Sequence, residues 1–367
     1  MKEFDKKNDA LIIAELGTSH NGDIQKAKEM ITAAGEAGAS CAKFQIVYAD
    51  EILHPKTGEV LLPGGKIRLY DKFKTLEVPP DFYAEIKKYT ESRGMLFLCT
   101  PFGMKSASIL KNLNPKMVKI ASPELNFTSL LEEISTWDVP VLLSSGVSRL
   151  GDIENALETL LPTPHSPLPT QICLLHCVTA YPAPETDYNL RLLPNLSAIF
   201  GVPVWVSDHS IDPELVPALA VSMGASVVEK HFCLSRKDPG LDDPIALEPA
   251  DFSKMVKAVR CAEKRGCEET IAHYKDEKGS EFVEQILGSG IKKLAACERA
   301  NYRLTNRSIH ALRDIAAGEV LKKGDYAVLR TEKMLRPGLE PFWEKALEGR
   351  ITRNDIPDGE GIRFEDV

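Results

Sequence analysis

Two histidines follow apolar, strand-like runs that are separated by one helical pattern over residues 213–225. His209 ends the segment VWVSDH and His231 ends SVVEKH. Because side chains alternate along a strand, Ser207 shares a face with His209, and Glu229 shares a face with His231. If the two strands are parallel neighbours, both imidazoles lie at the same end of a sheet. Two neutral imidazoles at that separation could hold a divalent metal.

Two lysines, Lys43 and Lys119, lie inside other apolar runs. Burying an unpaired ammonium is costly, so the pair indicates an anion between them, with phosphoenolpyruvate or a sugar phosphate as candidates. The alternative is that these lysines form structural salt bridges with Glu15, Glu124 or Glu229. Further polar residues fall within or just after the predicted strands: Gln45, Thr100, Ser122, Ser144, Ser145, His176 and Asp208.

Eight strand-like segments alternate with helical patterns, which is typical of parallel strands joined by crossover helices. That number of units within one domain predicts a TIM (β/α)8 barrel, whose chemistry lies at the carboxyl ends of the strands. A doubly wound sheet is the competing fold, but no GxGxxG motif follows the first strand. The predicted strands span residues 10–16, 41–47, 95–101, 117–124, 140–146, 171–178, 202–209 and 226–232.

The remaining segments complete the predicted domain organisation. A long polar insertion over 48–76 resembles an active-site loop or lid. Residues 266–300 are weakly patterned and predict a linker with one helix. Short apolar runs separated by glycine turns then predict a small β-rich module that must dock onto the barrel for stability. We therefore expect a barrel over 1–280, a linker over 281–303 and a β-rich domain over 304–367.

Composition narrows the possible functions. The chain has 367 residues and a net charge of -8, which argues against a nucleic-acid partner. The opening residues MKEFDKKND are too polar for a signal peptide, and no apolar run is long enough to span a membrane. Eight scattered cysteines indicate free thiols, so we expect a cytoplasmic protein without membrane contacts.

Several motifs together resemble the sialic acid synthase family. They are AELGTSHNGD, AGASCAKFQ, TPF, VKIASPE, LLSSG, LLHCVTAYPAP, SDHS, VVEKHF and DPGLDD, in that order along the chain. The segment RSIHALRDIAAGEVL with LRPG resembles the antifreeze-like (SAF, β-clip) domain of the same family. The resemblance covers nearly the whole chain, and SDH followed by E-x-H one βα unit later is its most specific part.

The resemblance implies a transferase of sialic acid biosynthesis, N-acetylneuraminate synthase-like, that works as a domain-swapped homodimer. The family condenses phosphoenolpyruvate with the open-chain aldehyde of an N-acylated hexosamine, giving a nine-carbon 3-deoxy-2-keto acid and phosphate. N-acetylmannosamine, its 6-phosphate and a 2,4-diacetamido-trideoxyhexose all stay open as the sugar. The last of these would make the chain a legionaminic or pseudaminic acid synthase.

The resemblance also implies roles for individual residues. His209 and His231 would bind Mn2+ or Mg2+. Glu15, Glu229 and Tyr181 would be catalytic, and Arg336 would reach into the partner subunit's site to hold the N-acyl group. Thr179 occupies a position where many members carry Asn. The residues implied to bind substrate are Lys43, Gln45, Thr100, Phe102, Lys119, Ser122, Glu124, Ser144, Thr179, Ser207, Asp242 and Arg336.

The mechanism implied by the resemblance begins with polarisation of the aldehyde by the metal. C3 of phosphoenolpyruvate then attacks, an oxocarbenium-like centre forms at C2, and water steered by Glu15 or Glu229 adds there before phosphate leaves by C–O cleavage. The carboxylates suit a developing cation and a water that must lose a proton. Two other functions stay open: a Schiff-base aldolase or lyase that uses one of the lysines, and a non-catalytic sugar- or phosphate-binding barrel.

Overall fold

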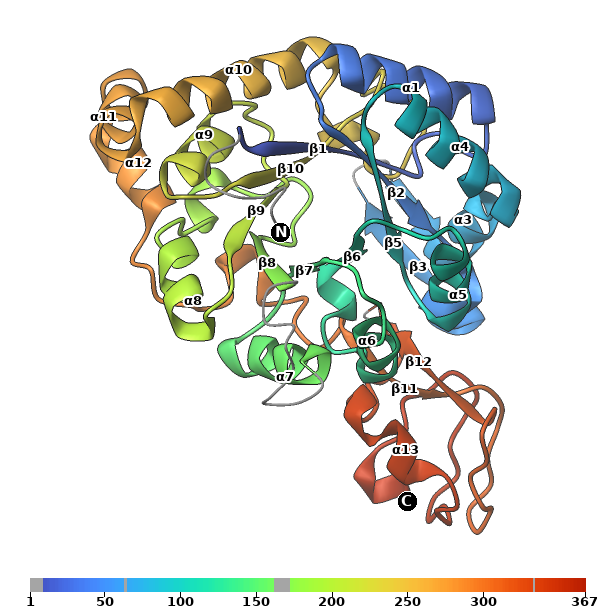
Figure 1. Cartoon of the computed structure of the whole chain (residues 1–367). Helices are drawn as coiled ribbons and strands as arrows, with labels where there is room; N and C mark the ends of the chain where they lie inside the picture. The colour runs from blue at the N-terminus through green and yellow to red at the C-terminus, as the bar shows by residue number, and fades with distance from the viewer. Residues whose placement is uncertain (1–8, 63–64, 162–171, 333) are drawn as a thin grey trace.

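Eight parallel strands form a nearly closed barrel, which Figure 1 shows end-on. The computed structural model describes residues 9–62, 65–161, 172–332 and 334–367. Hydrogen-bonded strands follow the order β5-β2-β1-β10-β9-β8-β7-β6, and β5 and β6 are in contact at the remaining seam. The barrel strands are β1 (Leu11–Gly17), β2 (Cys41–Ile46), β5 (Leu96–Pro101), β6 (Val118–Ile120), β7 (Val141–Ser144), β8 (Ile172–Cys177), β9 (Val204–Asp208) and β10 (Val227–His231).

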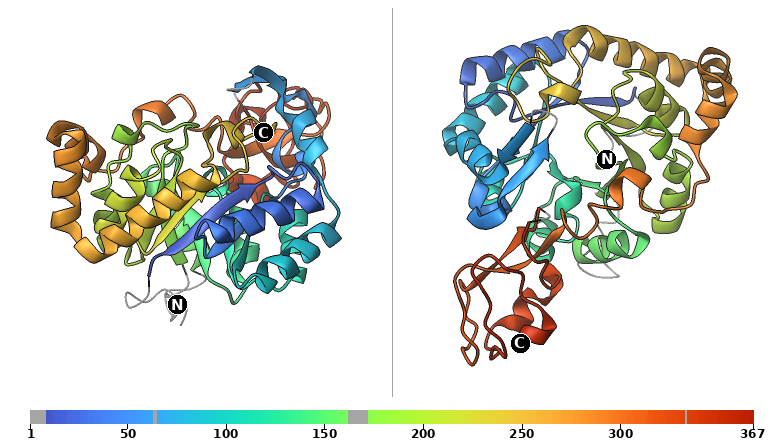
Figure 2. Two further views of the ribbon diagram at one scale, coloured as in Figure 1. Left: turned by 90° about the horizontal axis from the view of Figure 1, so that it is seen from above. Right: turned by 180° about the vertical axis from the view of Figure 1, so that it is seen from behind.

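Helices surround the strands on the outside of the barrel, as both views in Figure 2 show. The crossover helices bury apolar side chains against the barrel, which is the layer order that the alternating sequence pattern predicts. The helices are α1 (Ile24–Glu36), α2 (Ala49–Ile52), α3 (Leu69–Leu76), α4 (Pro80–Ser92), α5 (Met104–Asn112), α6 (Thr128–Ser135), α7 (Leu150–Leu160), α8 (Leu192–Phe200), α9 (Leu215–Ser222), α10 (Pro249–Arg265), α11 (Cys267–Lys278), α12 (Ser280–Leu287) and α13 (Glu344–Leu347).

The strand register brings charged side chains from distant parts of the sequence to one end of the barrel. Glu15 of β1 pairs in register with Lys43 of β2 on one side and with His231 of β10 on the other. Where β10 pairs with β9, Glu229 lies opposite Ser207. All of these side chains are buried although most of the surrounding strand residues are apolar. The carboxyl ends of β1, β2, β9 and β10 therefore carry a polar cluster on a hydrophobic barrel.

The predicted TIM barrel is confirmed, but three segments differ from the sequence prediction. The insertion over 48–76 is not a plain loop, because it holds α2, α3 and the antiparallel hairpin β3 (Glu59–Leu62) and β4 (Gly65–Arg68). Two helices, α11 and α12, occupy the segment expected to hold one. The fourth predicted strand ends at Ile120, and Ser122–Glu124 forms a 3-10 turn. Pro123 favours that turn because it lacks the N–H that a strand ladder needs.

The C-terminal module lies against one side of the barrel near α6 and the β5–β6 seam (Figures 1 and 2). Its longest ladder is antiparallel, between β11 (Arg307–Ala311) and β12 (Tyr326–Arg330). Isolated bridges join other segments of the module, and Arg330 also bridges to Leu53 of the barrel. The apolar side chains Ile309 and Val328 belong to the same buried cluster as the barrel core. Docking therefore supplies hydrophobic burial that so small a unit lacks alone.

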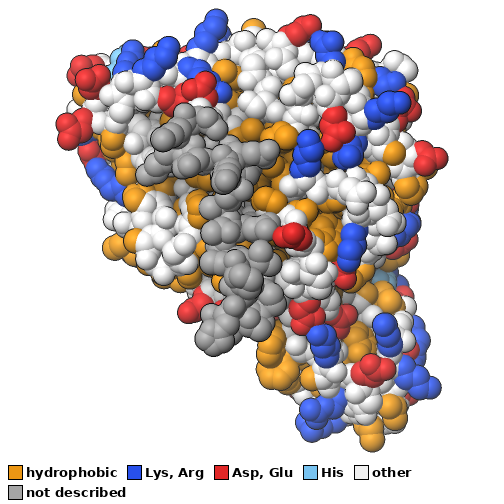
Figure 3. Space-filling view, viewed as in Figure 1, with side chains coloured by type: hydrophobic (Ala, Val, Ile, Leu, Met, Phe, Trp, Pro, Cys, Tyr) orange, Lys and Arg blue, Asp and Glu red, His pale blue; other side chains and the backbone are white. Residues whose placement is uncertain are grey.

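The face of the molecule in Figure 3 carries basic and acidic side chains interspersed with one another. No broad single-sign patch is visible on the part of this face that the structure describes. Among the helices that the structure describes, none combines the length and apolar character needed to cross a bilayer.

A buried ion pair fastens the loop that follows β9. Lys230 Nζ donates to Asp208 Oδ2 at 2.5 Å, to the Ser210 carbonyl at 2.6 Å and to the Asp212 carbonyl at 3.2 Å. The side chains of Lys230 and Asp208 are 1% and 0% exposed. One ammonium group of β10 thus holds the end of β9 and the loop that follows it.

We expect Lys230→Met to lower the free energy of unfolding by about 3–5 kcal/mol, because it leaves the Asp208 carboxylate buried without its cation. Urea unfolding followed by circular dichroism measures this loss. Lys254→Met on the exposed face of α10 is the matched control, and we expect it to change stability by less than about 0.5 kcal/mol. Equal stability of the two variants would contradict the structural role of Lys230.

Candidate active site

A small cavity of about 70 Å³ opens at the carboxyl ends of the barrel strands. The strand ends are where TIM barrels hold their reacting groups. Every barrel strand, or the turn after it, contributes at least one of its lining residues. They are Glu15, Lys43, Gln45, Thr100, Phe102, Lys119, Ala121, Ser122, Pro123, Ser144, Cys177, Tyr181, Ser207, His209, Glu229, His231 and Asp242.

The two histidines lie side by side at this cavity, as the sequence pattern predicts. Their ring centroids are 5.4 Å apart, and the ring of Tyr181 stacks on His209 at 4.5 Å. His209 Nδ1 is 2.7 Å from the carbonyl oxygen of Val178. Since a carbonyl only accepts, Nδ1 carries the proton and Nε2 keeps its lone pair. Burial lowers the pKa of His209 to about 4 and that of His231 well below its usual value, so both rings are neutral at pH 7.

Two neutral imidazoles with free lone pairs are suitable donors for a divalent metal. Asp242 Oδ2 lies 3.8 Å from His231 Nδ1, and Glu15 lines the same cavity. Within the described part of the chain, no group of three or more His, Cys, Asp or Glu side chains has an arrangement that could hold a metal ion. The residues therefore fit a metal as a pair of imidazole ligands, and the other coordination positions would fall to substrate or water.

The two lysines form a charge network with two carboxylates. Lys43 Nζ bonds to Glu15 Oε2 and lies 3.5 Å from Glu229 Oε2, and Lys119 Nζ lies 3.5 Å from Glu229 Oε1. Burial opposes ionisation throughout, but Lys119 and Lys43 outweigh it at Glu229 and hold its pKa at about 2. The salt bridges proposed as the alternative from sequence thus exist for Glu15 and Glu229, but within the cavity.

Lys119 is the less compensated cation of the network. Burial lowers the pKa of Lys119, and the attraction of Glu229 only partly offsets this effect. At Lys43, in contrast, the attraction of Glu15 and Glu229 exceeds the effect of burial, and the pKa is raised. An anion beside Lys119 would favour its charged form. The electrostatics of the cavity therefore suit an anionic ligand on the β6 side.

Three buried polar atoms in the cavity lining have no hydrogen-bond partner among the described residues. They are Thr100 Oγ1, Ser144 Oγ and Glu229 Oε2. Buried polar atoms in folded proteins are nearly always satisfied, so orphaned ones that line a cavity indicate a ligand or water. Two of the three are hydroxyl groups that can donate to an anion. They lie on β5 and β7, the strands on either side of β6 with Lys119.

Most of the remaining predicted site residues also line the cavity. Gln45 Nε2 donates to Glu15 Oε1 at 2.6 Å, and Ser207 Oγ donates to Glu229 Oε1 at 2.8 Å. Each orients a carboxylate of the network. Tyr181 is 42% exposed and lies at the cavity rim beside the histidines. Its position suits contact with a substrate that enters from solvent.

Three predicted site residues do not line the cavity, namely Glu124, Thr179 and Arg336. The backbone N–H of Thr179 donates to Glu298 at 2.7 Å behind the cavity wall. Arg336 bonds to Asp366 at 2.7 Å and to the Gly361 carbonyl at 3.1 Å, both within the C-terminal module. It therefore lies apart from the cavity of its own chain.

Glu124 contacts the C-terminal module, where its carboxylate bonds to two arginines. Arg307 and Arg330 both donate to Glu124 Oε1, at 2.9 Å and 2.6 Å. Arg307 is fully buried and also donates to the carbonyls of Phe102 at 2.6 Å and Glu51 at 2.5 Å. Phe102 follows β5 and Glu124 follows β6. One guanidinium of the module thus joins the ends of the two strands on either side of the seam.

We expect Glu124→Ala to lower the free energy of unfolding by about 3–5 kcal/mol, since it leaves buried Arg307 without its carboxylate. Loosened docking should also make segment 288–306 more sensitive to protease. Urea unfolding and limited proteolysis measure both effects, with Glu269→Ala on exposed α11 as the control. If Glu124 instead served only to bind substrate, the variant would show an altered KM and unchanged stability.

The sequence analysis missed the contribution of the segment before the C-terminal module. Lys292 and Glu298 lie in the stretch expected to be a linker, but their side chains bond to the barrel loops. Lys292 bonds to the loop after β7, and Glu298 bonds to the loops after β7 and β8. Cys177, Ala121 and Pro123 also line the cavity. Two charged residues in a weakly patterned stretch carry no sequence signal of this kind, because only folding shows which linker residues become buried.

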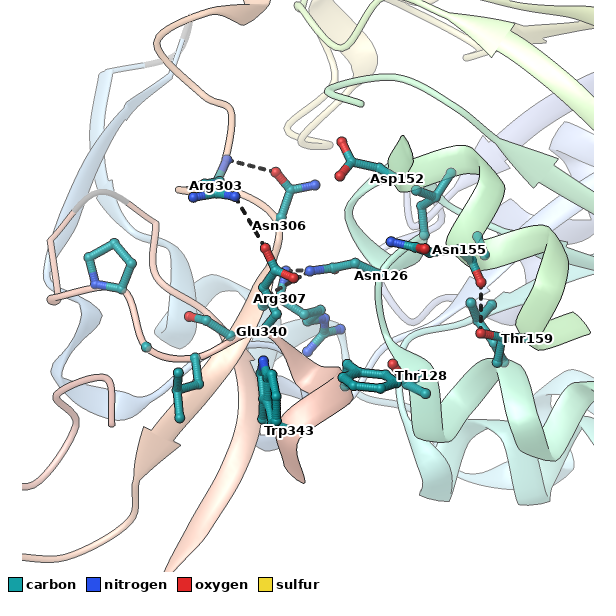
Figure 4. Close-up of a pocket in the computed structure, with 18 of the residues that line it drawn as sticks. Asn126, Thr128, Asp152, Asn155, Thr159, Arg303, Asn306, Arg307, Glu340 and Trp343 are labelled. Carbon is teal, nitrogen blue, oxygen red and sulfur yellow. Dashed lines mark hydrogen bonds and ion pairs between the residues drawn. The ribbon is translucent and has the colours of Figure 1, made fainter. Parts of the chain in front are cut away.

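A larger cavity of about 870 Å³ lies away from the histidines and lysines. Figure 4 shows it between the barrel and the C-terminal module, with Asn155 and Thr159 of α7 on one side and Glu340 and Trp343 of the module on the other. Among the described residues that line it, none has a buried polar atom without a hydrogen-bond partner. The chemistry of this chain is therefore better sought at the smaller cavity.

The fold and site define a (β/α)8 protein with paired imidazoles and paired lysines at the strand ends, joined to a docked β-rich module. Comparison with known families agrees. The model of the NeuB family matches residues 30–269, and that of the SAF domain matches residues 306–367. This chain belongs to the NeuB family and ends in an SAF domain.

Individual relatives support this assignment. The chain is 33% identical over 332 residues to the N,N'-diacetyllegionaminic acid synthase of Legionella pneumophila, covering 89% of this chain and 86% of the relative. The crystal structure of spore coat polysaccharide biosynthesis protein SpsE from Bacillus subtilis superposes with a TM-score of 0.80 at 30% identity, covering 98% and 95% of the two chains. The N-acetylneuraminic acid synthetase of Leptospira borgpetersenii has a TM-score of 0.63 at 29% identity, covering 80% and 90%.

Proposed function

We propose that this protein condenses phosphoenolpyruvate with the open-chain aldehyde of an N-acylated hexosamine, giving a nine-carbon 3-deoxy-2-keto acid and phosphate. The observation that carries the proposal is the content of one small cavity: two neutral imidazoles, two buried lysines and orphaned hydroxyls. Synthases of legionaminic and N-acetylneuraminic acid among its relatives support the reaction class.

The β5–β7 side of the cavity suits phosphoenolpyruvate. Lys119 supplies the incompletely compensated cation, and the hydroxyls of Thr100 and Ser144 supply neutral donors. Ser122 Oγ accepts from the Gly146 N–H at 3.0 Å and lies 3.0 Å from Cys177 Sγ, and its hydroxyl is a further donor on this side when it turns toward the ligand. We assign the phosphate and carboxylate of phosphoenolpyruvate to these groups.

The sugar aldehyde belongs on the opposite side, near the histidines and Tyr181. Mn2+ or Mg2+ held by His209 and His231 would polarise the aldehyde oxygen as a Lewis acid. C3 of phosphoenolpyruvate then bonds to the aldehyde carbon, whose oxygen takes up a proton, and C2 becomes electron-deficient. Glu15 and Glu229 are the carboxylates nearest the lysines, and they are suited to stabilise this centre and to take the proton of the attacking water.

The tetrahedral product of water addition collapses when the C2–O bond breaks and phosphate leaves. The carbonyl oxygen of the keto acid then derives from water, and the former bridging oxygen departs with phosphate. The fate of these two oxygens distinguishes cleavage of the C2–O bond from a mechanism in which water attacks the phosphorus atom and the P–O bond breaks.

The test is incubation of the protein with phosphoenolpyruvate, Mn2+ and each of three sugars: N-acetylmannosamine, its 6-phosphate and a 2,4-diacetamido-trideoxyhexose. Phosphate release and product mass are measured with and without a chelator. Phosphoenolpyruvate with 18O in the bridging position should yield labelled phosphate. Labelled keto acid, or turnover that is insensitive to the chelator, would contradict the mechanism. Borohydride trapping of a lysine adduct would instead support the lyase alternative.

We further propose that the protein works as a domain-swapped homodimer in which Arg336 completes the partner's site. Two observations support it: the Arg336 side chain is 30% exposed, and it lies apart from the cavity of its own chain. A mixture of Lys119→Met and Arg336→Ala proteins, refolded together, should regain activity because one dimer site would combine an intact barrel with an intact SAF domain. No gain over the separate variants would contradict the swap.

A further inference from the structure

We propose that Glu298, in the segment before the SAF domain, is a positioning residue that sets the spacing of the two loops beside the phosphoenolpyruvate subsite. Its side chain lies behind the cavity wall and does not line the cavity. The inference rests on the proposed function, because it assigns Glu298 to the subsite for one substrate only.

The first observation is the bonding of one carboxylate oxygen. Glu298 Oε1 accepts from the backbone N–H of Val147 and from that of Thr179, both at 2.7 Å. Val147 follows β7, and Thr179 follows β8. Glu298 is 1% exposed, so both hydrogen bonds are charge-assisted and shielded from water. A single atom therefore holds two successive barrel loops at a fixed separation.

The second observation is that the β7 loop is strained where Glu298 holds it. Val147 adopts a φ of 45°, in the left-handed region that a β-branched residue rarely occupies. Such a conformation persists only where surrounding contacts impose it. The bond from the Val147 N–H to Glu298 is one such contact. Without it, we expect the loop to relax toward an ordinary conformation.

The third observation connects this loop to the cavity. Gly146 packs so closely against its neighbours that an added Cβ would lie 2.7 Å from Cys177 Sγ and 2.9 Å from Ser122 Oγ. Gly146 also donates its N–H to Ser122 Oγ at 3.0 Å. Cys177 and Ser122 both line the cavity. A shift of Val147 therefore passes through Gly146 to Ser122 and, along the same loop, to Ser144.

Lys292, from the same segment as Glu298, contacts the same β7 loop. Its Nζ donates to the Ser145 carbonyl at 3.2 Å, so it contacts the residue between Ser144 and Gly146. Burial lowers the pKa of Lys292, and Glu298 is the first of the acidic groups that oppose this effect. The segment thus places an anion and a cation beneath one loop. Because both come from the chain that leads into the SAF domain, the subsite depends on that segment being in place.

The experiment compares Glu298→Ala with Glu298→Gln in the full-length protein. Calorimetry measures phosphoenolpyruvate binding, and steady-state kinetics measures KM for each substrate and kcat. We expect Glu298→Ala to weaken phosphoenolpyruvate binding at least about tenfold, with the KM for the sugar changed less than about threefold. Glu298→Gln keeps an acceptor oxygen for both amides, and we expect its binding within about threefold of the wild type.

Two further variants make the result decisive. Glu269→Ala on exposed α11 should leave both substrates unaffected. If Glu298→Ala does not fold, Glu298→Asp, which keeps the charge but is too short to reach both amides, should show the same selective loss. Wild-type-like binding by the alanine or aspartate variant, or equal losses for both substrates, would overturn the inference alone. A wild-type protein that does not bind phosphoenolpyruvate overturns the proposed function as well.

Discussion

We expect Lys119→Met to reduce kcat/KM for phosphoenolpyruvate by roughly 10²–10³-fold or more. A loss of this size is typical when an enzyme loses one preorganised donor that stabilises negative charge on its substrate. Lys119 is buried, and its nearest carboxylate contact, with Glu229, is at 3.5 Å. Its ammonium therefore has capacity for a further anionic partner. Methionine has a similar volume but offers no charge and no donor.

The measurement for Lys119→Met is steady-state kinetics combined with calorimetric binding of phosphoenolpyruvate. Lys116→Met is the matched control, because this exposed lysine precedes the same strand at its opposite end. We expect the control to keep full activity. If Lys119→Met bound phosphoenolpyruvate as tightly as the wild type, the anion subsite would have to be placed elsewhere in the cavity.

Replacing either His209 or His231 with Ala should reduce turnover by about 10³-fold and abolish stoichiometric Mn2+ binding. Lewis-acid stabilisation of a developing charge contributes several kcal/mol, and about 4 kcal/mol corresponds to three orders of magnitude in rate. The two ring centroids are 5.4 Å apart, which is close enough for both rings to bind one ion. Loss of either ring therefore removes one of the two imidazole ligands. Phosphoenolpyruvate binding, which depends on Lys119 and its neighbours, should change much less.

Metal content after dialysis, measured by elemental analysis, and kinetics with and without a chelator test this prediction. His273→Ala on α11 is the control, since that imidazole is 42% exposed and lies 3.7 Å from Glu277, away from the cavity. Retained Mn2+ binding in both the His209 and His231 variants would contradict the assignment of the metal to this pair. Retained metal with lost activity would instead assign the two rings to substrate.

Much of this architecture follows from local sequence patterns. Apolar runs such as that of β9 and β10 alternate with amphipathic helices, and this repeat determines a barrel almost independently of detail. The side-chain period of a strand also determines that Glu229 shares a face with His231 and that Ser207 shares a face with His209. The pairing of His209 with His231 could therefore be predicted, because it depends only on alternation and on neighbouring parallel strands.

Contacts between distant segments could not be read from the sequence. Glu124 has the sequence context of a strand-end site residue, but Arg307, 183 positions later, occupies its carboxylate. Glu298 lies in a stretch without helical or strand periodicity, yet it becomes buried against Val147 and Thr179. Local patterns record which residues prefer burial or a turn. The partner of each buried charge is decided when residues 288–367 pack against the barrel. Only the packed tertiary structure removes water from these groups and makes the choice of partner energetically important.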